Sequence, residues 1–66
     1  MISEWELWAC ANHVHDQHGT DASRVIAERI ATLAQAGDQA GVATWQAIAE
    51  RYTTLVARRD EAIPTH

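Results

Sequence analysis

Apolar side chains recur along this chain at the spacing of an α-helix. Two octapeptides, 26–33 and 48–55, match at six of eight positions and begin 22 residues apart. In each, an apolar residue occupies the first, fifth and eighth position, which places all three on one side of a helix. The flanking segments show no such period, so we interpret the match as two helices presenting similar faces to one core, not as a duplicated unit.

The start of the first helix has a clear signal. Ser3 and Glu6 have the spacing of a capping box, in which a hydroxyl and a carboxylate satisfy unpaired backbone donors. Ile2 and Leu7 have the spacing of a hydrophobic staple across the same turn. The pattern predicts a helix that begins at residue 4.

Two glycines divide the remaining pattern. Gly19 and Gly37 can each adopt the left-handed conformation that ends a helix, and residues that favour an N-cap follow both. The sequence therefore predicts an all-α fold, a compact three-helix domain with short glycine-containing connections. We expect a single domain over residues 1–66, with helices at roughly 4–18, 21–36 and 39–62.

Three residues inside these helices suggest particular packing. Gly41 lies four residues before Trp45, and a helical side chain leans over the preceding turn, so Gly41 is expected to leave room for the indole or for a close helix crossing. Arg29 has apolar neighbours on its helix and is expected to lie partly over apolar surface with its guanidinium near a carboxylate. Arg51 is expected on the polar side of its helix.

Composition limits the core and the classes of ligand. Of 66 residues, 47% are hydrophobic, but thirteen of those are alanine, which adds little apolar area. So small a core favours a dimer or a partner. The net charge is −4, with five arginines and no lysine, and no basic stripe could follow phosphates, so we expect no direct nucleic-acid binding.

The chain shows no sign of export or membrane insertion. It has neither a basic leader nor an apolar run of membrane-spanning length, so we expect no membrane association. Cys10 is the only cysteine, which rules out a disulfide within the chain and favours a reducing, cytoplasmic location.

The residues that could carry chemistry form no recognisable catalytic set. His13, His15 and His18 cluster, but their i, i+2 and i+3 spacings differ from the i, i+4 pairs of helical metal sites. Metal binding by these histidines stays an alternative, and structural histidines are the simpler interpretation. Cys10 lies at the edge of an apolar face with no histidine one turn away, so it is expected to be a small core residue. We expect no enzymatic activity, no catalytic residues and no cofactor.

One aromatic residue does not fit the predicted core. Trp5 projects about 160° from Leu7, toward Asn12 on the polar side of the first helix. Either the C-terminal tail or the end of the third helix covers it, or it belongs to a surface that contacts a partner. The candidate partner surface comprises Trp5, Trp8, Asn12, His15 and Arg29.

A longer pattern joins several of these residues. His18-Gly19 and Asp21-Ala22 give HG-x-DA, residues 27–30 give AERI, and residues 36–45 give AGD-x-x-G-x-x-x-W. In this combination the chain resembles a group of small bacterial helical proteins of unknown function. The resemblance implies a compact helical protein and supplies no activity or site residues. It runs from residue 7 to residue 55.

The expected function follows from the small core and the unassigned tryptophan. We expect a small non-enzymatic protein-interaction or regulatory module that acts as a homodimer or bound to a larger protein. One alternative is an acidic inhibitor that blocks a nucleic-acid-binding site on an enzyme, favoured by the net charge of −4. A further alternative is metal binding through the histidines.

Overall fold

Helices form almost all of the structure. The computed structural model describes residues 3–62, with side chains described for residues 3–58. The elements are the α-helix α1 (Glu4–His18), the short 3-10 helix η1 (Gly19–Asp21), and the α-helices α2 (Ala22–Gln35) and α3 (Gln39–Ala62). No strand occurs within the described range. The predicted all-α class is therefore confirmed.

The first helix begins where the capping residues predict. The Ser3 hydroxyl accepts a hydrogen bond from the Glu6 backbone N–H at 3.2 Å and donates to the Glu6 carboxylate, also at 3.2 Å. These bonds satisfy one of the unpaired donors of the first turn. The expected staple involves Ile2, which lies outside the described residues.

The junction between α1 and α2 differs from the prediction. Gly19 has a φ of 55°, as expected for a residue that ends a helix, and its N–H bonds to the His15 carbonyl. However, the chain continues at once as η1, and the Ala22 N–H donates to the Gly19 carbonyl. Residues 4–35 thus form one helical stretch that bends at η1. The short glycine-containing connection expected here is thus itself helical, and α1 and α2 together form one long, bent helical segment that is followed by α3.

The turn between α2 and α3 follows the glycine signal. Gly37 has a φ of 76°. The Gly37 N–H donates to the Ala34 carbonyl at 3.1 Å, and the Asp38 N–H donates to the Leu33 carbonyl at 2.9 Å. This pair of bonds is the Schellman motif, which satisfies carbonyls at the end of a helix. The Asp38 carboxylate then accepts from the Gly41 N–H at 2.9 Å and caps α3.

This cap also accounts for Gly41. A Cβ added to Gly41 would lie 2.6 Å from the Asp38 carboxylate oxygen Oδ2, too close for any non-bonded contact. The glycine therefore leaves room for the capping carboxylate. The three atoms nearest to this position all belong to Asp38, whereas the sequence-based expectation was room for Trp45 or for a helix crossing.

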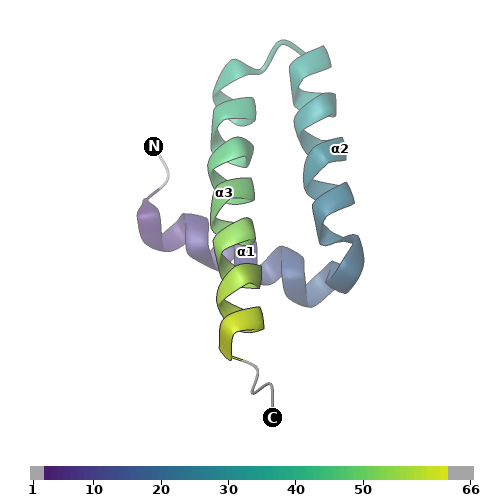
Figure 1. Ribbon diagram of the computed structural model, residues 1–66. Helices are drawn as coiled ribbons and strands as arrows, with labels where there is room; N and C mark the ends of the chain where they lie inside the picture. The colour runs from purple at the N-terminus through teal and green to yellow at the C-terminus, as the bar shows by residue number, and fades with distance from the viewer. Residues whose placement is uncertain (1–2, 63–66) are drawn as a thin grey trace.

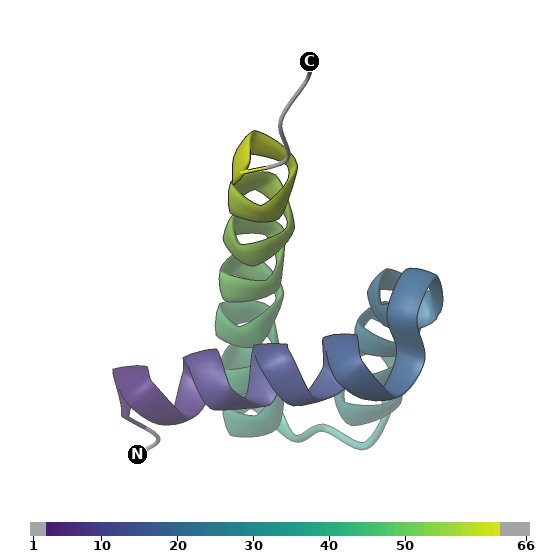
Figure 2. The same cartoon turned by 90° about the horizontal axis from the view of Figure 1, so that it is seen from below.

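α2 and α3 lie side by side and run in opposite directions, while α1 crosses them (Figure 1). Figure 2 shows the crossing from below, with the first turns of α1 on the side of α3 that is remote from α2. The core has two adjoining clusters at the crossing. Buried residues of the first are Leu7, Ala11 and Ile48. Those of the second are Val14, Ala22 and Ile26.

Gly37→Ala tests the turn that reverses the chain. Because an L-residue with a Cβ is disfavoured at positive φ, the substitution should lower the free energy of unfolding by about 1–2 kcal/mol in urea titrations. Gly37→Asn is the matched control, since asparagine tolerates the left-handed region, and it should cost less. Equal stability of the alanine variant and the parent protein would contradict this account of the turn.

Candidate functional site

Trp5 is the large hydrophobic residue that the described structure leaves in solvent. The helical spacing of α1 turns it away from the buried stripe of Leu7, Ala11 and Val14, and 77% of the residue is exposed. The described side chains of α3, which extend to Arg58, leave it exposed. The C-terminal tail, the other cover expected from the sequence, falls at residues 63–66 and lies outside the described residues.

Trp8, one turn further along α1, is held against α3. The guanidinium carbon of Arg58 lies 5.7 Å from the centre of the Trp8 ring, within the range of a cation–π contact. The Asn12 side-chain amide donates to the Trp8 carbonyl at 3.0 Å. Trp8 and Asn12 are half-buried. The Arg58 contact holds the Trp8 ring beside the exposed Trp5.

His15 continues the same side of α1. Its ring centre lies 6.0 Å from that of Tyr52 on α3, and the two planes are inclined by 45°. Its Nδ1 atom is buried and has no hydrogen-bond partner among the described residues. His15 therefore contributes to packing at the crossing.

An ion pair fixes the start of α1 to α3. Arg51 donates to both carboxylate oxygens of Glu4, from Nε at 2.6 Å and from a terminal nitrogen at 2.7 Å. Its side chain is only 23% exposed. The expectation that Arg51 lies on the polar side of its helix is thus wrong, because α1 crosses there and supplies the carboxylate. The hydrogen bonds from Arg51 lower the pKa of Glu4 and, in return, raise the pKa of Arg51.

Arg29 has a different environment from Arg51. Its guanidinium carbon lies 5.3 Å from the centre of the Trp45 ring. Arg29 therefore lies over apolar surface as expected, but the group beside its charge is an indole in place of the expected carboxylate. This contact joins α2 to α3.

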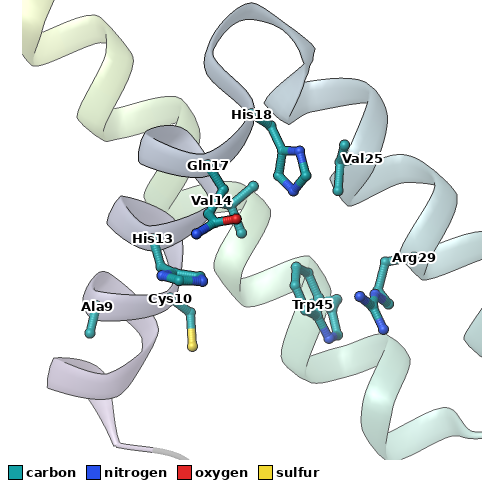
Figure 3. A pocket seen from close by; sticks show the side chains of 9 residues that line it. All are labelled: Ala9, Cys10, His13, Val14, Gln17, His18, Val25, Arg29 and Trp45. Carbon is teal, nitrogen blue, oxygen red and sulfur yellow. The ribbon is translucent and has the colours of Figure 1, made fainter.

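Arg29 and Trp45 also form one wall of a groove of about 550 Å³ between the three helices (Figure 3). α1 forms the opposite wall. The groove is lined by Ala9, Cys10, His13, Val14, Gln17, His18, Val25, Arg29 and Trp45. Among these described residues there are three basic side chains and no carboxylate.

The structure divides the predicted partner surface in two. Trp8 and His15 face α3 on one flank of the crossing, whereas Arg29 borders the groove on the other flank. Helical spacing places Trp5 and Asn12 within about 60° of Trp8 on α1. We call Trp5, Trp8, Asn12 and His15 the tryptophan flank, and Arg29 lies apart from it.

The groove is the feature that sequence reasoning missed. Cys10 is half-buried, packs against the first core cluster and lines the groove, so its expected place at the edge of the core is correct. Trp45 packs against both core clusters and also forms the groove wall under Arg29. The sequence showed that Arg29 has apolar neighbours on its own helix. It could not show which residue of α3 would contact the guanidinium.

The three histidines of α1 do not form one cluster. His13 and His18 line the groove, whereas His15 packs on Tyr52. Within the described residues, no group of three His, Cys, Asp or Glu side chains is placed to hold a metal ion. No helix in residues 3–62 combines the length and apolar character needed to span a bilayer.

Comparison with known proteins identifies the family. Residues 3–60 match a family of unknown function, DUF6961. The chain belongs to this family. The DUF6961 match confirms the expected membership of an uncharacterised family, and it extends past residue 55, where the sequence pattern ended. No curated protein and no solved structure matched the chain.

The Glu4–Arg51 pair predicts how stability depends on pH. Because the folded-state pKa of Glu4 lies below its unfolded value, the pair stabilises the protein fully above the unfolded pKa. This stabilisation is lost as the pH falls through the folded pKa. Glu4→Gln should therefore reduce the loss of stability between neutral and acidic pH, measured by urea unfolding at each pH.

Arg51→Gln provides the control for this measurement. With the guanidinium absent, a further Glu4→Gln substitution should change the acid dependence little, because both substitutions remove the same interaction. Additive effects of the two substitutions would show that the pair does not join α1 to α3 in solution.

Proposed function

We propose that this protein is a non-enzymatic interaction module, acting as a homodimer or bound to a larger protein whose activity it adjusts. The observation that carries the proposal is the 77% exposure of Trp5. A tryptophan side chain has a large apolar area, and leaving it in water forgoes the free energy that its burial would supply. Tryptophan is also among the residues that most often dominate the binding energy of protein interfaces.

The neighbours of Trp5 support this role because they are already held in place. Trp8 contacts Arg58, and Glu4 is paired with Arg51, so two side chains within one turn of Trp5 are fixed to α3. A partner that covers Trp5 would meet a surface whose side chains need little further ordering. Such preorganisation lowers the entropic cost of association.

The lone cysteine supports a reducing, cytoplasmic location as part of this proposal. The acidic inhibitor and the histidine–metal site remain predictions from sequence. Neither is favoured by a contact described for residues 3–58.

Trp5→Ala separates a binding role from a structural one. Because the side chain is mostly exposed, the substitution should change the free energy of unfolding by less than about 0.5 kcal/mol and leave helix content by circular dichroism unchanged. It should abolish association, measured by light scattering on the pure protein and by affinity capture from its own host. Leu7→Ala, on the buried side of α1, should instead cost about 2–5 kcal/mol.

Two outcomes would contradict the proposal. A monomer that captures no protein would exclude the interaction role. A Trp5→Ala variant as unstable as Leu7→Ala would show that Trp5 is covered within the monomer.

A further inference from the structure

The groove has an apolar floor to which all three α-helices contribute. The floor consists of the lining residues that are buried or half-buried, which are Cys10 and Val14 on α1, Val25 on α2 and Trp45 on α3. Figure 3 shows these side chains around one space. Its volume of about 550 Å³ lies within the range of small-molecule pockets, roughly 300–1,000 Å³. The floor therefore suits the apolar body of a small molecule.

The rim of the groove is polar and positively charged. Apart from Ala9, the exposed lining residues are His13, Gln17, His18 and Arg29. Arg29 supplies a guanidinium, which carries a full positive charge. The other three side chains are able to donate hydrogen bonds. An anionic group would thus meet favourable partners at the rim, and an apolar group would meet them on the floor.

The charge of Arg29 has no carboxylate partner among residues 3–58. Its guanidinium lies over an indole ring, which carries no net charge. Glu28, its neighbour in the chain, pairs with Arg24 at 3.1 Å. Glu6, which helical spacing places on the groove side of α1, accepts a hydrogen bond from the Ser3 hydroxyl. Arg29 is therefore able to bind a carboxylate that comes from outside the chain.

We propose that the groove binds a small apolar carboxylate, that is, an aromatic ring or a short acyl chain that carries one carboxylate group. The apolar body lies on the floor against Val14 and Trp45, and the carboxylate accepts hydrogen bonds from Arg29 at the rim. A planar guanidinium presents paired N–H donors that match the two oxygens of a carboxylate. Its contact with Trp45 holds Arg29 at the rim before the ligand arrives, which lowers the entropic cost of binding. This site goes beyond the proposed interaction role and does not depend on Trp5.

The charges of the protein favour one carboxylate over a polyanion. Arg29 is the single arginine in the described lining, and the chain contains no lysine. A nucleic acid or another polyphosphate would require several such cations. The net charge of −4 would also repel a highly charged anion. A single carboxylate on an apolar body matches a single guanidinium above an apolar floor.

Calorimetric titration of the whole chain with 2-naphthoate and with octanoate tests the site. At least one of the two should bind with one-to-one stoichiometry, and their relative affinities distinguish a ring from an acyl chain as the body. The neutral naphthalene-2-carboxamide and octanamide should bind about tenfold more weakly or less tightly still, because a charge-assisted hydrogen bond is lost. Failure of both carboxylates to bind, or equal affinities for the carboxylates and the amides, would overturn the proposal.

Arg29→Gln tests the residue that receives the carboxylate. The substitution removes the charge and should raise the dissociation constant of the carboxylate about tenfold or more. Arg24→Gln is the matched control on α2, since Arg24 pairs with Asp21 and Glu28 outside the groove, and it should leave the affinity unchanged. Parental affinity in Arg29→Gln would overturn the assignment.

Because Arg29 also joins α2 to α3, a second variant leaves that contact intact. Ala9→Glu adds a carboxylate at an exposed lining position and should weaken binding about fivefold or more through like-charge repulsion, while helix content by circular dichroism stays unchanged. Ala27→Glu is its control, because Ala27 is exposed on α2 outside the lining and receives the same charge. Equal weakening by the two variants would overturn the groove as the site.

The thiol of Cys10 reports whether the ligand occupies the groove. Cys10 is the only cysteine and lies on the groove floor, so N-ethylmaleimide modifies one known position. A saturating carboxylate should slow this modification severalfold in the parent protein, and the same concentration should slow it less in Arg29→Gln. An unchanged rate at saturation would place the bound carboxylate elsewhere and overturn the proposal.

Sedimentation equilibrium separates a ligand site from an interface between copies. If a second copy covered the groove, Ala9→Glu would weaken self-association and neither carboxylate would bind, and this result would overturn the ligand site. Trp5→Ala should bind the carboxylate with parental affinity, because Trp5 does not line the groove. Loss of association in Trp5→Ala therefore bears on the proposed function, and loss of carboxylate binding in Arg29→Gln bears on the groove.

Discussion

The packing of α1 across α3 positions every other feature of this protein. At the crossing, Ala11 is 0% exposed and Ile48 is 1% exposed, and Leu7 completes the buried cluster. A small side chain at the centre of such a contact lets two helices approach closely. The crossing brings Arg51 to Glu4 on one flank and opens the groove on the other. Loss of the packing between α1 and α3 would disrupt both the Glu4–Arg51 pair and the groove, because each consists of residues from α1 and from α2 or α3.

Because the core is small, most of the large aromatic side chains lie at its edges and not inside it. In the described residues the buried core consists of six hydrophobic residues, two of them alanine. The larger aromatic residues Trp8, Trp45 and Tyr52 lie around it and are half-buried. Their contacts with Arg58, Arg29 and His15 join the helices through cation–π and ring packing. Trp5 makes none of these contacts, because its position on α1 points its side chain away from the core.

Local signals predicted local structure, and contacts between helices required the fold. Ser3 and Gly37 determine helix ends through bonds to residues no more than five positions away, so the sequence was sufficient there. The bend at η1 was missed because Gly19 both ends an α-helix and begins a 3-10 turn, and the glycine signal is the same for a loop. The groove was missed because α1, α2 and α3 each contribute to it. The exposure of Trp5 was one of two expectations from the sequence, and α1 periodicity was the correct guide.

The twin octapeptides show why sequence identity does not fix the role of a residue. Arg29 and Arg51 occupy the same position in nearly identical segments, and both segments form helices whose isoleucine side packs into the core. Arg51 pairs with Glu4 because the start of α1 lies beside it, whereas Arg29 lies over Trp45 because α3 is its neighbour. Pairing with a carboxylate neutralises the guanidinium of Arg51, but an indole carries no net charge and leaves Arg29 able to attract an anion. The two arginines therefore differ in function: Arg51 stabilises the helix crossing, and Arg29 gives the groove its positive charge.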